Sequence, residues 1–267
     1  MKILFIGDIV GQPGRRAVRE LVPALVEDYR IDMVIANCEN AAAGFGVTRD
    51  IVEELYRCRI DVLTSGNHIW DKKEILEFAE DYETLLRPAN YPDGAPGFGS
   101  VVMPCLSGVH VGVINLAGRV FMRPLDCPFM TVEKEIEKLR RKTRIILVDM
   151  HAEATSEKQA MGWFLDGRVS AVIGTHTHVQ TADEQILPQG TAYLTDAGMT
   201  GPFDSIIGTK KDAVLERFLK QMPNKFEVAK GDVRLQGALI TVDEATGRGL
   251  DIERISVALK ESGYGSW

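Results

Sequence analysis

The chain contains 267 residues, of which 45% are hydrophobic and 26% are charged, and it carries a formal net charge of −7. This composition is typical of a soluble globular protein and excludes a disordered or fibrous chain. The acidic balance argues against a general nucleic-acid binder, which needs a surplus of Lys and Arg, but a small anionic substrate stays compatible because bound metal ions reverse the local field.

No apolar segment is long enough for a secretory signal or a membrane span. The first apolar run, residues 3–6, ends before Asp8, and no later run reaches the length that a signal core or a spanning helix needs. The cysteines form no C-x-x-C pair, which favours reduced, buried thiols and a cytoplasmic protein. These cysteines are Cys38, Cys58, Cys105 and Cys127.

Short apolar runs alternate with segments of helical period, the order typical of an α/β protein. Strands are predicted at residues 2–7, 33–38, 61–65, 109–116, 144–150 and 169–174. Helices are predicted between them at residues 15–29, 49–58, 72–81, 132–141 and 156–165. Thr48 and Thr131 are expected to cap the second and the fourth of these helices.

After Glu184 the pattern changes to strands joined by tight turns. Strands are predicted at residues 185–188, 191–195, 225–229, 233–242 and 249–257, with one helix at about residues 210–221. The Pro/Gly-rich stretch 87–99 is expected to be an exposed connection. Because the alternation resumes beyond it, and no repeat or charge block follows, we predict one domain over residues 1–267.

Residues that can bind metal ions follow five of the predicted strands. Since ligands bind at the carboxyl ends of the strands in α/β sheets, these side chains are expected to converge on one edge. The set is Asp8 after residues 2–7, Glu39 and Asn40 after 33–38, Asn67 and His68 after 61–65, His151 after 144–150, and His176 and His178 after 169–174.

Each member of this set also has a purely structural explanation. Asp8 can cap a helix, Asn67 can form a turn, and His151 can be a hydrogen-bonded residue at a strand end. Capping alone does not account for so many such residues after successive strands, so the set as a whole favours a functional site. His110, which begins an apolar strand, is predicted to be structural.

The types of candidate ligand narrow the choice of metal ion. Imidazole, carboxylate and amide ligands without thiolate favour iron or manganese, with zinc or cobalt also compatible, in a site that keeps water bound. The donors are too many for one ion, and a pair of ions bridged by the Glu39 carboxylate accounts for them. Two such ions activate water and stabilise charge on a phosphoryl group, which indicates hydrolysis.

Three motifs occur in the order Gly66-Asn67-His68, His151 and Gly174-Thr175-His176-Thr177-His178. They resemble the G-N-H, H and G-H-x-H motifs of the calcineurin-like metallophosphoesterases. Two departures are visible: the usual D-x-H is Asp8-Ile9-Val10, and the usual G-D is Glu39-Asn40. These departures, and the segment Thr195-Asp196-Ala197-Gly198-Met199-Thr200-Gly201, resemble the YmdB-like subfamily over almost the whole chain.

The resemblance implies a four-layer α/β fold, a central β-sandwich flanked by helices (α/β/β/α). It also implies a phosphodiesterase acting on 2′,3′-cyclic nucleotides by a metal-activated water, with His68 as the proton donor. A histidine suits that role near neutral pH. The implied ligands are Asp8, Glu39, Asn40 and His178 for one ion and Glu39, Asn67, His151 and His176 for the other.

Alternatives remain at this point. The motifs do not exclude a metal-dependent phosphomonoesterase or nuclease on the same scaffold. A nucleotide or metal sensor with little catalysis is a further alternative, against which the complete ligand set argues. Gly44-Phe45-Gly46 either approaches the substrate or forms a plain turn, and Arg119 and Arg123 either contact phosphate or cover surface. The expected partner is a small phosphodiester, with no membrane and no general nucleic-acid binding, and a homo-oligomer is left open.

Overall fold

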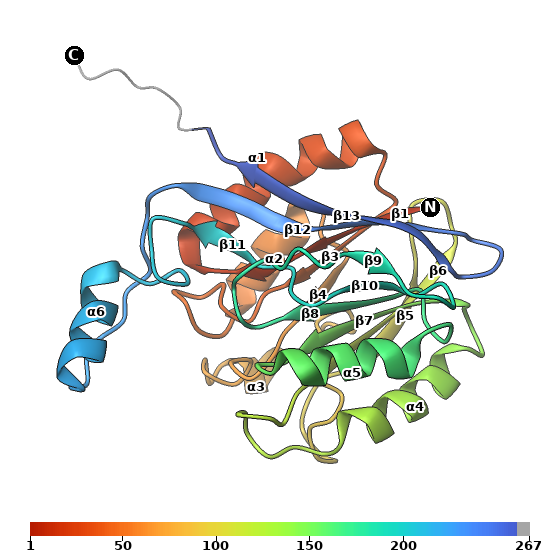
Figure 1. The fold of residues 1–267 in the computed structure, drawn as a ribbon, viewed down its shortest axis with the longest axis horizontal. Helices are drawn as coiled ribbons and strands as arrows, with labels where there is room; N and C mark the ends of the chain where they lie inside the picture. Colours follow the sequence, from red (N-terminus) through yellow and green to blue (C-terminus); the bar gives the residue numbers. More distant parts are fainter. Residues whose placement is uncertain (261–267) are drawn as a thin grey trace.

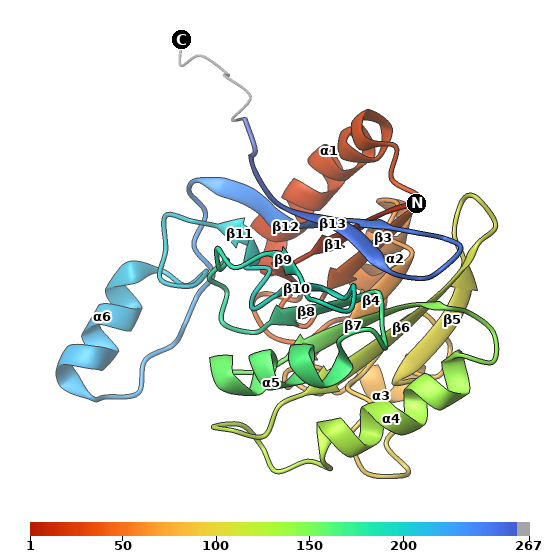
Figure 2. The same cartoon turned by 45° about the vertical axis from the view of Figure 1, so that its right-hand side comes forward.

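Two β-sheets lie face to face in the computed structural model, which describes residues 1–260 (Figures 1 and 2). The first sheet has seven strands in the order β2 (Asp8–Ile9), β11 (Met199–Pro202), β12 (Val233–Val242), β1 (Lys2–Ile6), β3 (Met33–Asn37) and β4 (Val62–Thr64), with β13 (Gly249–Ala258) paired to β12. The second has six strands in the order β5 (Ser100–Pro104), β6 (His110–Ala117), β7 (Ile145–His151), β8 (Ala171–Thr175), β10 (Ala192–Leu194) and β9 (Gln185–Ile186).

Helices cover the outer faces of both sheets. On the first sheet lie α1 (Gly11–Tyr29), α2 (Arg49–Arg57) and the short α3 (Ile75–Phe78), whose apolar residues share one core with that sheet. On the second lie α4 (Pro128–Leu139) and α5 (Thr155–Leu165), which share a second core with it. The last helix, α6 (Lys211–Lys220), stands apart from both sheets in Figures 1 and 2.

Successive side chains of a strand alternate between the core that lies between the two sheets and the core under the helices. Ile3 and Phe5 of β1 join the core between the sheets, whereas Leu4 and Ile6 join the core under α1, because successive side chains of a strand point to opposite faces. Both faces of each sheet are therefore covered, and the layers run helix, sheet, sheet, helix. The prediction of a four-layer α/β fold is confirmed.

The strands that precede the candidate site run in parallel. β1 is parallel to β3, and β3 to β4; in the other sheet β6, β7 and β8 are parallel to one another. The carboxyl ends of β1, β3 and β4 lie beside those of β7 and β8, which is the position where α/β sheets bind ligands.

Three sequence predictions of element type were wrong or incomplete. Residues 225–229 do not form a strand, because Val228 makes only an isolated bridge to Thr209 and no neighbouring strand is there to extend the ladder. The predicted helix 72–81 is reduced to α3 between turns. The strands β2, β5 and β11 are short and carry weak patterns, and the sequence did not predict them.

The predicted caps also differ from the structure. The helix predicted from residue 132 begins at Pro128, whose fixed φ suits a first helical position, so Thr131 lies inside α4 rather than capping it. Thr48 does stand at the N-cap of α2, but its side chain makes no capping hydrogen bond. The backbone N–H of Arg49 instead donates to Glu74 Oε1 at 2.9 Å.

None of the helices described within residues 1–260 combines the length and apolar character that crossing a bilayer requires. All four cysteines are free; Cys38, Cys58 and Cys105 are buried, and Cys127 is half-buried.

Candidate metal centre

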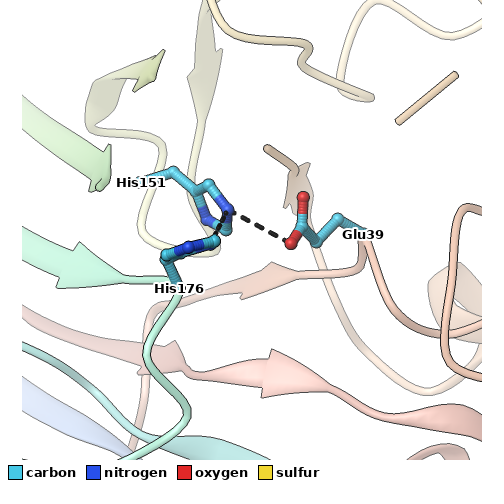
Figure 3. A group of neighbouring side chains, drawn as sticks. All are labelled: Glu39, His151 and His176. Carbon is cyan, nitrogen blue, oxygen red and sulfur yellow. Dashed lines mark hydrogen bonds and ion pairs between the residues drawn. The ribbon is translucent and has the colours of Figure 1, made fainter. Parts of the chain in front are cut away.

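Glu39, His151 and His176 meet at the edge formed by the carboxyl ends of β3, β7 and β8 (Figure 3). His151 Nε2 lies 3.1 Å from Glu39 Oε1 and 3.0 Å from His176 Nδ1. The ligand atoms of the three residues are all within 4.8 Å of one another. This is the spacing at which three side chains can share one ion. The fourth predicted member, Asn67, places its Oδ1 3.1 Å from His151 Nε2.

A second group lies next to the first and shares Glu39 with it. Asn40 Nδ2 is 3.3 Å from Glu39 Oε1 and 3.0 Å from His178 Nε2. Asp8 Oδ1 lies 3.9 Å from both His178 Nε2 and His151 Nδ1. The structure therefore brings together every residue that the sequence proposed as a metal ligand, in two neighbouring groups.

A glycine allows the Gly66-Asn67-His68 turn to approach the cluster. A Cβ at Gly66 would stand 2.2 Å from the His151 ring and 2.5 Å from Glu39 Oε2. With glycine there, the turn lies against both side chains, and the backbone N–H of His68 donates to Glu39 Oε2 at 3.0 Å. His68 Nδ1 faces Asp71 Oδ2 at 2.8 Å, so the carboxylate favours a proton on that nitrogen and orients the ring.

The buried charges of the cluster act on one another. Burial opposes a charge on His151, but the carboxylates of Glu39 and Asp8 outweigh it and raise the pKa of His151 to about 9. Burial and the adjacent His151 lower the pKa of His176 to about 3. Burial raises the pKa of Asp8. Burial also opposes the charge on Glu39, but His151 holds the pKa of this carboxyl at about 2. The carboxylates thus favour a positive charge between them.

Behind His151, a buried carboxylate orients its ring. Thr175 Oγ1 lies 2.9 Å from His151 Nδ1 and donates its proton to Asp149 Oδ1 at 2.7 Å. Since a hydroxyl has one proton, Nδ1 must be the donor to Thr175, which turns Nε2 toward Glu39. Asp149 Oδ2 also accepts from Asn37 and Thr64, and burial raises the pKa of Asp149 to about 6.

The segment that carries His176 and His178 is held by a buried ion pair. Both histidines have left-handed backbone, with φ of 100° and 65°, a conformation that L-residues seldom adopt. Lys158 Nζ donates to Asp196 Oδ2 at 2.8 Å and to the Thr175 carbonyl at 3.2 Å. The backbone N–H and the hydroxyl of Thr177 donate to the same carboxylate oxygen. The residues flanking His176 are therefore fixed.

The donor set fits a bound cation. Asp8 is fully buried, and its Oδ1 has no hydrogen-bond partner among residues 1–260. An unpaired buried carboxylate oxygen is costly unless it is paired with a cation or coordinates a metal. Imidazole, carboxylate and amide groups surround that oxygen, and such donors suit transition-metal ions. The buried cluster therefore fits the metal ions that the sequence indicated.

A cavity of about 650 Å³ opens onto the cluster. Glu39, His68 and His176 line one side of it, and Gly44 and Phe45 lie at its rim. The Phe45 ring packs edge-on against His68, with ring centroids 4.9 Å apart. Of the two interpretations of the Gly44-Phe45-Gly46 segment, this position favours an approach to the substrate.

Some residues named from the sequence do not join this site. His110, at the opposite end of β6, is exposed and supplies only its carbonyl, to Thr143 Oγ1. Arg119 and Arg123 are exposed, and neither lines the cavity. Their suggested phosphate contacts have no support in this geometry. The backbone N–H of Arg119 instead donates to Glu157.

Sequence reasoning missed the residues behind the ligands. Asp149 is an acidic residue inside the apolar strand β7 and was visible as a charge in apolar surroundings, whereas the fully buried Lys158 of α5 stands among polar residues in the sequence. Asp71 follows His68 by three residues, a spacing that also could have indicated a pair. Asp196 follows the strand predicted at residues 191–195, but its pairing with Lys158 was not visible because the two come from distant segments.

The fold and the cluster together define a metallophosphoesterase, with candidate ligands at the carboxyl ends of strands in a β-sandwich flanked by helices. The family model described as YmdB-like protein matches residues 4–255, and the chain belongs to this family.

Relatives with curated names and relatives with solved structures support this assignment. The chain is 50% identical over 257 residues to a Bacillus subtilis protein named 2′,3′-cyclic-nucleotide 2′-phosphodiesterase, a match that covers 96% of this chain and 97% of that protein. A crystal structure of a hypothetical protein from Thermus thermophilus has 43% identity and a TM-score of 0.90, covering 97% of this chain and 99% of the other.

A second crystal structure, described as a novel phosphatase from Mycoplasma pneumoniae, has 34% identity and a TM-score of 0.90, covering 97% of this chain and 93% of the other. The expected resemblance to YmdB-like metallophosphoesterases is confirmed, and so is the prediction of an enzyme of the phosphodiesterase class.

Proposed function

We propose that this enzyme hydrolyses 2′,3′-cyclic nucleotides at the bond to the ribose 2′ oxygen, with two metal ions held by the cluster. The observation that carries the proposal is the cluster of histidines, carboxylates and amides, of which Glu39, Asn40, His176 and His178 line the same cavity as His68. The name of the Bacillus subtilis relative supports the substrate class.

The two groups of side chains supply the ligand sets. One ion would be held by Asp8, Asn40 and His178, and the other by Asn67, His151 and His176. Glu39 would bind both ions. Such ions, when bound, supply positive charge for the phosphoryl oxygens and activate water. Iron and manganese suit these ligands, and zinc and cobalt are compatible with them.

His68 supplies the proton for the leaving group in this proposal. A water molecule releases one proton to solvent and its oxygen forms a bond to phosphorus, the bond from phosphorus to the ribose 2′ oxygen breaks, and His68, carrying protons on both ring nitrogens, donates the Nε2 proton to that oxygen and later regains one from solvent. The product is a nucleoside 3′-monophosphate. Asp71 holds Nδ1 of the ring, which leaves Nε2 as the nitrogen for transfer.

Turnover of three substrates tests the proposal. Metal-loaded protein is given 2′,3′-cyclic AMP, p-nitrophenyl phosphate and a short RNA, and products are separated by chromatography. We expect fast conversion of the cyclic nucleotide to the 3′-monophosphate. Faster turnover of the monoester or of the RNA would replace the proposal with a phosphomonoesterase or a nuclease. No turnover with two ions bound would favour a sensor.

A further inference from the structure

The wall of the cavity opposite the cluster belongs to a separate part of the chain. Residues 203–229, which we call the arm, leave the first sheet after β11, form α6 and return before β12. Figures 1 and 2 show α6 standing clear of both sheets. The arm nevertheless contributes Ile207, Val214, Phe218 and Val228 to the cavity that contains Glu39 and His176.

The base of the arm is fastened next to the candidate metal ligands. The Ile207 carbonyl accepts a hydrogen bond from His178 Nδ1 at 3.0 Å. The methyl groups of Val228 lie over the turns at Gly11 and Gly44, so close that a Cβ on either glycine would be 3.1 or 3.2 Å away. The arm is thus held at a fixed place beside the cluster.

Aromatic side chains line the space between the arm and His68. Phe45 contacts the His68 ring from the body of the molecule, and Phe218 and Phe226 line the cavity from the arm. Arg217, also in the lining, stacks over Phe226 with its Cζ 5.1 Å from the ring centroid. Phe218 is 72% exposed and so contributes little to the core. A large aromatic residue kept exposed at the mouth of a cavity points to ligand binding.

The chemistry of the reaction indicates what this wall contacts. If His68 protonates the leaving oxygen, the organic group attached to that oxygen lies beside His68, and hence beside Phe45 and the arm. In a cyclic nucleotide that group is a ribose carrying a planar base. Bases stack on aromatic rings and on guanidinium planes, and both are present here.

We propose that the arm binds the base of the substrate and that Phe218 is a specificity-determining residue for nucleotides over other phosphodiesters. The proposal rests on the proposed function, since it assumes a nucleotide substrate. It assigns the apolar wall to recognition and leaves the chemistry of bond cleavage to the cluster and His68.

The test compares two variants of neighbouring residues on α6. Phe218→Ala removes an aromatic ring from the cavity wall, whereas Leu219→Ala removes a side chain that is 83% exposed and does not line the cavity. Kinetics are measured with 2′,3′-cyclic AMP and with 1-O-methylribose 2′,3′-cyclic phosphate, which has the same reacting group and no base.

For Phe218→Ala we expect KM for 2′,3′-cyclic AMP to rise about tenfold, the usual cost of losing one base-stacking ring, with kcat unchanged. KM for the base-free diester should not change, and Leu219→Ala should leave both substrates unaffected. An equal effect on both substrates, or an altered molecular mass of Phe218→Ala in light scattering, would overturn the proposal.

Failure of the proposed function is distinguishable from failure of the arm proposal. If wild-type protein turns over neither diester, the proposed function fails, and calorimetric binding of adenosine 3′-monophosphate then tests the arm. Weaker binding to Phe218→Ala than to Leu219→Ala supports base recognition. Equal affinity for the two variants contradicts it.

Discussion

At the scale of single residues, His68 combines three contacts that suit a proton donor. Its ring lines the cavity, Asp71 holds Nδ1 at 2.8 Å, and its backbone N–H fixes the shared ligand Glu39. His68→Ala keeps that backbone contact but removes the imidazole. We expect kcat for 2′,3′-cyclic AMP to fall by about 10²–10⁴-fold, the usual contribution of general acid catalysis, with metal content unchanged in elemental analysis.

Asp71→Asn provides the matched comparison for His68. It keeps the imidazole and removes only the negative charge that orients it, so a smaller loss of kcat is expected than for His68→Ala. If His68→Ala retained the kcat of wild-type protein, another group would have to protonate the leaving oxygen.

The residues of the candidate metal centre were recognisable individually in the sequence, because each follows a predicted strand whose apolar pattern is clear. Asp8, Glu39, His151 and His176 needed only the rule that parallel strands end at one edge. The residues behind them were not predictable in the same way. Asp149 contacts Thr175, which in turn contacts His151, and that arrangement depends on the pairing of β7 with β8.

At the scale of elements, the ion pair between Lys158 of α5 and Asp196 after β10 holds the segment after β8. Asp196→Ala leaves a buried lysine without its partner, and breaking such a pair costs about 3–5 kcal/mol of unfolding free energy. Urea denaturation monitored by circular dichroism measures this loss.

A double variant separates stability from positioning of the histidines. Lys158→Met with Asp196→Leu removes both charges, and apolar replacement of a buried pair recovers much of the stability. Thr177 still loses its acceptor, so we expect the affinity for Co²⁺, followed by visible absorption, to drop about 10–100-fold as for other residues that orient ligands. If the double variant binds Co²⁺ with the affinity of the wild-type protein, the ion pair contributes to the stability of the fold but not to metal binding.

At the scale of the whole molecule, a metal bound between the two sheets should stabilise the fold. Metal present at 100 times its Kd adds about 2.7 kcal/mol, which for a chain of this size raises Tm by about 5–10 °C. Calorimetry of metal-free protein with and without Mn²⁺ measures the shift. Glu39→Gln, which alters the shared ligand, should lose most of the shift, and His110→Gln, far from the cluster, should keep it. Equal shifts in both variants would mean that Mn²⁺ binds elsewhere.

The sequence by itself predicted most of the strands and helices in their order and proposed the candidate ligands, because strand and helix periodicity is local and these residues stand where predicted strands end. Only the tertiary structure decided how the candidate ligands come together. The pairing of strands within each sheet brings Glu39 to Asn67 and His151 to His176, and the packing of one sheet on the other joins these pairs. Within the arm, the helix predicted at about residues 210–221 is confirmed as α6, but the strand predicted at residues 225–229 was wrong, because a strand forms only beside another strand.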